Sequence, residues 1–203
     1  MNVEYIIIST TIFLVLNLMT FLGLSRDWNK TYRQFIFKKW MDIAVYILTY
    51  VVTVFTCYAI GYKGTSLLCA FIILATYNIF LIINQLLYFD KNRTTLDSKA
   101  FPYILLSLIV GLISSFAQIN FCLYYFDNSL FELNQKMTAF EMAIEFLYYA
   151  FTVTITYSNS TITANGVLSK IIQMVYVSFT YFLLANSIFV LIESSKKPKD
   201  KNR

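Results

Sequence analysis

Histidine is absent from this 203-residue chain, and charged residues make up only 13% of it. Without histidine the chain lacks the commonest general base and the commonest metal ligand. In soluble domains roughly a quarter of the residues are charged. The low fraction of charged residues in this chain therefore argues against a soluble fold. The apolar runs hold no aspartate pair, Ser–Lys dyad or HExxH motif. We therefore expect no enzyme activity, no metal site and no cofactor.

Cysteine is also scarce. The three cysteines are Cys57, Cys69 and Cys122, each inside an apolar run and none in a CxxC pair. This spacing supports neither a disulfide framework nor a zinc site. We interpret all three as small apolar residues that fill space between helices.

Apolar residues are abundant: 58% of the chain is hydrophobic, with 19 Phe and 16 Tyr. One soluble core of this size cannot hide so much apolar surface, so lipid is the expected solvent. A helix needs about 20 apolar residues to cross the hydrocarbon core. Five runs are long enough, at residues 3–24, 43–60, 66–89, 101–126 and 168–192. The sequence therefore predicts an all-α integral membrane protein with five transmembrane helices.

Basic residues predict the orientation of these helices. Residues 25–42, residues 90–99 and the C-terminal tail together hold thirteen of the sixteen Lys and Arg residues. Five spans put these three segments on one side, and the positive-inside rule makes that side cytoplasmic. We expect a multi-pass plasma-membrane protein with its N-terminus outside and its C-terminus inside. The net charge of +5 is spread in this membrane pattern, so nucleic acid is not an expected partner.

The segment between the fourth and fifth spans has a different character. Residues 137–156 are apolar enough to enter a bilayer, yet Glu141 and Glu145 lie in their first half. A sixth span here would move the basic tail outside, against the charge rule. A re-entrant half-helix that returns to the outer side fits better, with both acids near its N-terminus. Backbone that turns back at membrane depth must face protein or water, which indicates a cavity or pore.

Residues 146–161, F-L-Y-Y-A-F-T-V-T-I-T-Y-S-N-S-T, resemble the pore region of the potassium-channel superfamily. The family pattern A-L-Y-F-S-F-V-T-L-T-T-V-G-Y-G-D aligns without a gap and matches at Leu147, Tyr148, Phe151 and Thr156. The resemblance covers residues 101–192 and implies an outer helix, a pore half-helix, a filter and an inner helix. One such module cannot enclose a pore, so the resemblance implies a homotetramer that conducts monovalent cations, K⁺ or Na⁺.

By position, the resemblance assigns the filter to Thr156, Tyr157, Ser158, Asn159 and Ser160. Serines replace both filter glycines, and glycine is the residue that most readily takes the backbone conformation of a carbonyl filter. This argues against potassium selectivity and for a wider hydrated pore lined by side-chain oxygens. Glu141 and Glu145 would attract cations from outside.

The last span holds two candidate pore-lining residues. Ser178 stands where the family's inner-helix glycine would fall, and Asn186 lies in the predicted cytoplasmic half. Asn186 has two interpretations, pore lining and hydrogen bonding between helices. The first three spans hold no arginine series, so voltage sensing of the usual type is not expected.

These features divide the chain into a three-helix membrane region (1–99), a channel-like module (100–193) and a basic cytoplasmic tail (194–203). Two alternatives to a conducting channel stay open. One is a non-conducting scaffold that keeps the channel architecture. The other is a small transporter or accessory membrane protein in which residues 137–156 pack as an ordinary amphipathic segment or a sixth span.

Overall fold

A computed structural model describes residues 32–60, 101–133, 136–155 and 160–196, together with scattered helical positions between 72 and 83. Within these residues the chain is mostly helical. The long helices are α2 (Tyr32–Ile60), α4 (Phe101–Phe126) and α6 (Val167–Lys196), and a shorter helix, α5 (Ala139–Thr154), comes between the last two. The predicted first span lies outside the described residues, as does most of the third.

Three helices are long and apolar enough to cross a membrane, over Lys39–Tyr58, Phe101–Phe126 and Val167–Phe189. They correspond to the second, fourth and fifth predicted spans. The fourth prediction coincides with α4, whose Pro102 occupies the first turn, where its missing N–H costs nothing. The chain is thus a multi-pass membrane protein.

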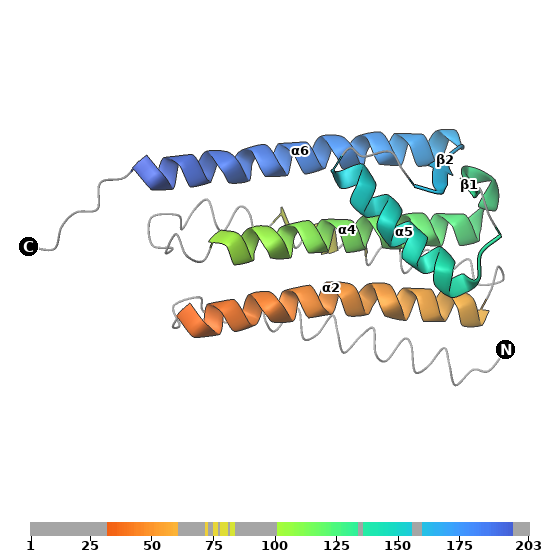
Figure 1. Cartoon of the computed structure of the whole chain (residues 1–203), viewed down its shortest axis with the longest axis horizontal. Coiled ribbons are helices and arrows are strands. Elements are labelled where there is room, and N and C mark those ends of the chain that lie inside the picture. Colours follow the sequence, from red (N-terminus) through yellow and green to blue (C-terminus); the bar gives the residue numbers. More distant parts are fainter. Residues whose placement is uncertain are drawn as a thin grey trace, which may run out of the picture.

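Helix α4 is the centre of this bundle, and it packs against α2, α5 and α6. Of its span 67% is buried, against 22% for α6. Figure 1 shows α2 and α4 running in the same direction and α6 running the opposite way. Close approach of α2 and α4 depends on Gly111, because a Cβ there would lie 2.9 Å from a ring carbon of Tyr46.

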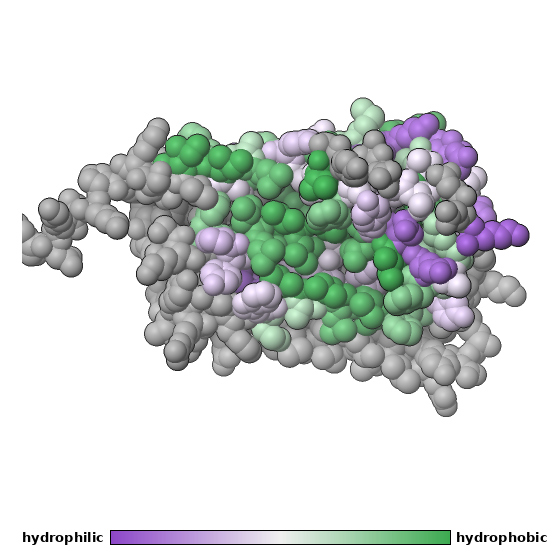
Figure 2. Space-filling model, viewed as in Figure 1, coloured by the Kyte–Doolittle hydropathy of each residue, from purple (hydrophilic) through white to green (hydrophobic). Residues whose placement is uncertain are grey.

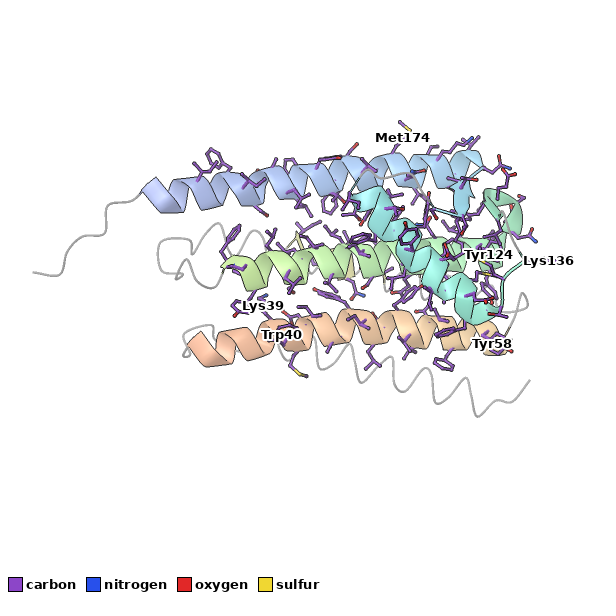
Figure 3. The ribbon with its side chains drawn as sticks, in the orientation of Figure 1. Lys39, Trp40, Tyr58, Tyr124, Lys136 and Met174 are labelled. Atoms are coloured by element: carbon purple, nitrogen blue, oxygen red, sulfur yellow. The ribbon has the colours of Figure 1, made fainter. Side chains whose placement is uncertain are left out.

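Aromatic side chains mark both ends of the lipid-facing surface of α2. Trp40 and Tyr58 are 52% and 68% exposed and lie near opposite ends of the apolar span Lys39–Tyr58 (Figure 3). At 1.5 Å per residue they stand about 27 Å apart, close to the roughly 30 Å thickness of a hydrocarbon core. Trp and Tyr favour the two membrane interfaces, so this spacing fits a helix that spans the bilayer.

A small sheet departs from the all-α prediction. Strand β1 (Phe131–Leu133) pairs antiparallel with β2 (Ile162–Ala164), with Glu132 opposite Thr163. A 3₁₀ turn, η3 (Asn128–Leu130), connects α4 to β1. The two strands flank α5 in the sequence, so their pairing brings the chain before α5 beside the chain after it. Figure 1 shows this sheet at the end of the bundle where α4 ends and α6 begins.

Candidate functional site

The candidate site is the segment from β1 to β2, with α5 at its centre. Helix α5 starts at the same end of the bundle as the sheet but on the side of α2, and it runs obliquely across α4 toward α6 (Figure 1). At 1.5 Å per residue its 16 residues span about 24 Å, which is less than a hydrocarbon core. Its bounds lie within the predicted half-helix at residues 137–156.

A capping box begins α5. The Thr138 hydroxyl accepts a hydrogen bond from the Glu141 backbone N–H, and the Glu141 carboxylate accepts one from the Thr138 backbone N–H at 2.8 Å. These bonds satisfy backbone donors that a helix start leaves open. Glu141 therefore lies in the first turn, as the sequence indicates. Hydrogen bonds from the backbone N–H and the hydroxyl of Thr138 lower the pKa of Glu141, which favours its ionised form.

Other acids share this end of the bundle. Hydrogen bonds from the hydroxyl and the backbone N–H of Ser129 lower the pKa of Asp127, which caps η3. Glu145 lies one turn after Glu141 in α5, and its carboxylate accepts a hydrogen bond from the Thr161 hydroxyl at 2.7 Å. Figure 2 shows hydrophilic residues gathered at this end, and a hydrophobic surface over the middle of the bundle.

The Leu130 carbonyl holds the entry and the exit of this segment together. Its oxygen accepts hydrogen bonds from the backbone N–H groups of Asn165 and Gly166, at 2.9 and 3.1 Å. The Ser169 hydroxyl, in the first turn of α6, lies 2.7 Å from the same oxygen. Gly166 is required here, because a Cβ would lie 3.1 Å from the Leu130 Cα. The start of α6 is thereby fixed beside the turn that follows α4.

Aromatic and hydroxyl groups anchor the far end of α5 against α4 and α6. The Thr154 hydroxyl lies 2.7 Å from the hydroxyl of Tyr176, nine residues into α6. Tyr176 stacks on Phe116 of α4 with 3.8 Å between ring centroids, and Phe116 also stacks on Tyr149 of α5. At 1.5 Å per residue this cluster lies about 14 Å along α6 from its start.

Apart from Glu141 and Glu145 in its first two turns, both faces of α5 are apolar. One face, with Ala143, Phe146, Tyr149, Ala150 and Val153, is buried in the bundle. The other carries five exposed large apolar residues at helical spacing, Phe140, Ile144, Leu147, Tyr148 and Phe151, and exposed Ile155 follows directly after the helix. A helix that is apolar on both faces over most of its length belongs inside a protein or a membrane rather than on a water-facing surface.

The structure describes only some of the predicted pore residues. Thr156, Tyr157, Ser158 and Asn159 lie outside the described residues, just beyond the end of α5. Ser160 is half-buried, and its hydroxyl accepts a hydrogen bond from the Ile162 backbone N–H at 3.1 Å. On α6, the side chains of Ser178 and Asn186 are exposed.

Sequence reasoning missed two features of this region. It did not indicate the β1–β2 sheet, because three-residue strands carry almost no periodic signal. It also did not indicate that the Leu130 carbonyl accepts hydrogen bonds from both Asn165 and Gly166. Cys57 and Cys122 are both buried, as expected. Comparisons of the chain with protein-family models, with curated proteins and with solved structures found no match.

Proposed function

We propose that this chain is one subunit of a tetrameric membrane channel that conducts monovalent cations, K⁺ or Na⁺. Helix α5 would be the re-entrant pore half-helix, α4 the outer helix and α6 the inner helix. The observation that carries the proposal is the combination of a helix too short to cross, apolar on both faces, and flanked by paired strands. Such a helix is suited to enter a bilayer and leave it on the same side.

The depth of α5 supports this proposal. Its last turn contacts Tyr176 about 14 Å along α6, which is roughly half of a 30 Å hydrocarbon core. The polar stretch from Thr156 to Ser160 follows directly. A polar backbone that begins at mid-depth needs water, ions or protein around it, which a pore on a fourfold axis would supply.

Helix α6 supports assembly from several copies. Most of its span is unburied within one chain, and it exposes the polar side chains of Ser178 and Asn186. A polar side chain facing lipid is unfavourable, so such residues normally face other helices or water. Neighbouring subunits and a central pore would meet that need for both residues.

The proposed orientation puts α5 at the outer side. The ionised carboxylates of Asp127 and Glu141 would then raise the local cation concentration at the mouth. The basic tail would be cytoplasmic, at the opposite end of α6. The parallel directions of α2 and α4 agree with this orientation, because each would run from the cytoplasmic side outward.

Flux through purified protein in phosphatidylcholine liposomes tests the proposal. We expect K⁺ or Na⁺ flux without chloride flux, and we expect Asn159→Lys to reduce it on the order of tenfold or more, because four cations would face the pore. The matched control is Tyr58→Lys, a charge of the same sign at a residue of α2 that is 68% exposed and lies away from α6 (Figure 3). Flux that responds equally to both variants would contradict the assignment of the pore.

A second candidate function is a non-conducting scaffold with the same architecture. It is favoured by Ser158 and Ser160, which stand where the resemblance places the two filter glycines. A tetramer without flux, in the native chain and also after Ser158→Gly and Ser160→Gly together, would favour this scaffold over the channel.

A further inference from the structure

Helix α5 receives a hydrogen bond from α2, a helix of the N-terminal region. The Tyr50 hydroxyl of α2 donates to the Ala143 carbonyl at 2.5 Å, across 93 positions of the sequence. Ala143 lies in the second turn of α5, where its carbonyl also accepts the helical bond from the N–H four residues later. A carbonyl oxygen has two lone pairs, so it can accept both bonds. The N-terminal region therefore contacts the candidate site directly.

Aromatic packing fixes the place of the Tyr50 ring. Tyr50 is 6% exposed, and its ring lies edge-on against Phe121 of α4 with 6.4 Å between the ring centroids. Phe121 in turn lies edge-on against Phe146 of α5 at 5.7 Å, and both phenylalanines are fully buried. Edge-to-face pairs at these distances are favourable contacts of aromatic side chains. They hold the ring between α4 and α5, so the hydroxyl stays within reach of the α5 backbone.

A second tyrosine hydroxyl holds the opposite end of α5. The Thr154 hydroxyl donates to the Ala150 carbonyl at 2.7 Å, and a hydroxyl has only one hydrogen to donate. Tyr176 of α6 is therefore the donor in the 2.7 Å contact between its own hydroxyl and that of Thr154. Each end of α5 thus accepts a hydrogen bond from a tyrosine, and the two tyrosines belong to different long helices.

The two bonds lie on opposite sides of α4. Figure 1 shows α2 and α6 on either side of α4, with α5 crossing between them. At 1.5 Å per residue, the bonded positions Ala143 and Thr154 are about 17 Å apart along α5. Because a helix bends only gently over such a length, a movement of α2 relative to α6 must tilt α5 or break one of the two bonds.

We propose that Tyr50 is a positioning residue that fixes the start of α5 to α2, while Tyr176 fixes the end of α5 to α6. The tilt of α5 is then set by the relative positions of α2 and α6. In the channel proposed above, the polar stretch from Thr156 to Ser160 follows α5, so a shift of α2 would be passed on to that stretch. This consequence for ion flux rests on the proposed function, whereas the positioning of α5 does not.

The variant Tyr50→Phe removes the hydroxyl and keeps the ring. It leaves no buried polar group without a partner, because the Ala143 carbonyl keeps its helical bond. Carbonyl-¹³C alanine and ¹⁵N isoleucine in the full chain mark this carbonyl, since only the alanines at positions 59 and 143 come directly before an isoleucine. We expect the Ala143 carbonyl signal in the NMR spectrum to move upfield in Tyr50→Phe, while the signal from position 59 stays in place.

Nitroxide spin labels then report the two ends of α5 separately. Phe140→Cys and Phe151→Cys, made one at a time in a full chain without its native cysteines, each carry one label. Both side chains are exposed, at 73% and 45%, and each stands three residues before a bonded position. We expect Tyr50→Phe to raise the mobility of the label at position 140 alone. Tyr176→Phe should raise the mobility of the label at position 151 alone.

Matched controls remove the hydroxyl of an exposed tyrosine from the same two helices, with Tyr58→Phe on α2 and Tyr181→Phe on α6. Neither control should shift the carbonyl signal or change either label. The proposal would be overturned if Tyr50→Phe left the Ala143 signal in place, left the label at position 140 unchanged, or mobilised both labels equally through a general loosening of the fold. Neither measurement needs ion flux, so absence of flux would count against the channel and not against the role of Tyr50.

Discussion

Replacing Phe116 with alanine is expected to lower the free energy of unfolding by about 3 kcal/mol. The ring is 1% exposed and is stacked between Tyr176 of α6 and Tyr149 of α5. In a bilayer the loss comes mainly from dispersion contacts, because lipid is as apolar as the protein interior. Since this ring joins three helices, the variant should also loosen the inner end of α5.

Unfolding in mixed micelles measures the Phe116 prediction. Leu106→Ala is the matched control, because Leu106 lies on the same helix and is 42% exposed. Phe116→Leu should recover part of the loss, since it leaves a smaller cavity. Equal destabilisation by Phe116→Ala and Leu106→Ala would show that the aromatic stack does not hold α5 in place.

Replacing Gly111 with valine is expected to destabilise the chain by about 3 kcal/mol. The first added carbon would lie 2.8 Å from Ile82 Cδ1 and 2.9 Å from Tyr46 Cε2. The end of the isoleucine side chain can move, but the Tyr46 ring is 1% exposed and has little room. Helices α2 and α4 must therefore separate, even though valine suits a helix better than glycine does.

Leu106→Val, at an exposed position of the same helix, is the matched control and should leave the free energy of unfolding unchanged. Stability of Gly111→Val within about 0.5 kcal/mol of wild type, the usual range of a surface change, would contradict the tight contact.

The length of the apolar runs was sufficient to predict the long helices. The run at residues 101–126 coincides with α4, and the one at 168–192 lies inside α6. Helix α2 begins at Tyr32, well before the predicted residue 43. A span is recognised by its apolar residues, but helical hydrogen bonding continues through the basic stretch that precedes them.

Around α5, the local structure could be predicted from the sequence, but the contacts between distant segments could not. Glu141 at the helix start follows from capping chemistry that is visible in the sequence. The β1–β2 pairing and the stacking of Phe116 on Tyr176 depend on how segments distant in the sequence pack together. The spacing of residues in a single sequence does not specify these long-range contacts, because they are set by helix register and by the angle at which α5 crosses α4.

The central claim is that the chain enters the membrane before α5 and leaves it on the same side after α5. Membrane-impermeant maleimide applied to intact cells tests this claim directly, with single cysteines at Lys136 and Thr163 in a chain without its three native cysteines. Both positions are exposed and flank α5, and Thr163 is preferable to the crowded Gly166. A third cysteine variant at Lys201, in the basic tail, reports the cytoplasmic side.

We predict that the cysteines at positions 136 and 163 react in intact cells, whereas the cysteine at position 201 reacts only after the membrane is permeabilised. Labelling of 136 and 163 from opposite sides would mean that the intervening helix crosses completely. That result would contradict the re-entrant segment and the channel proposed from it.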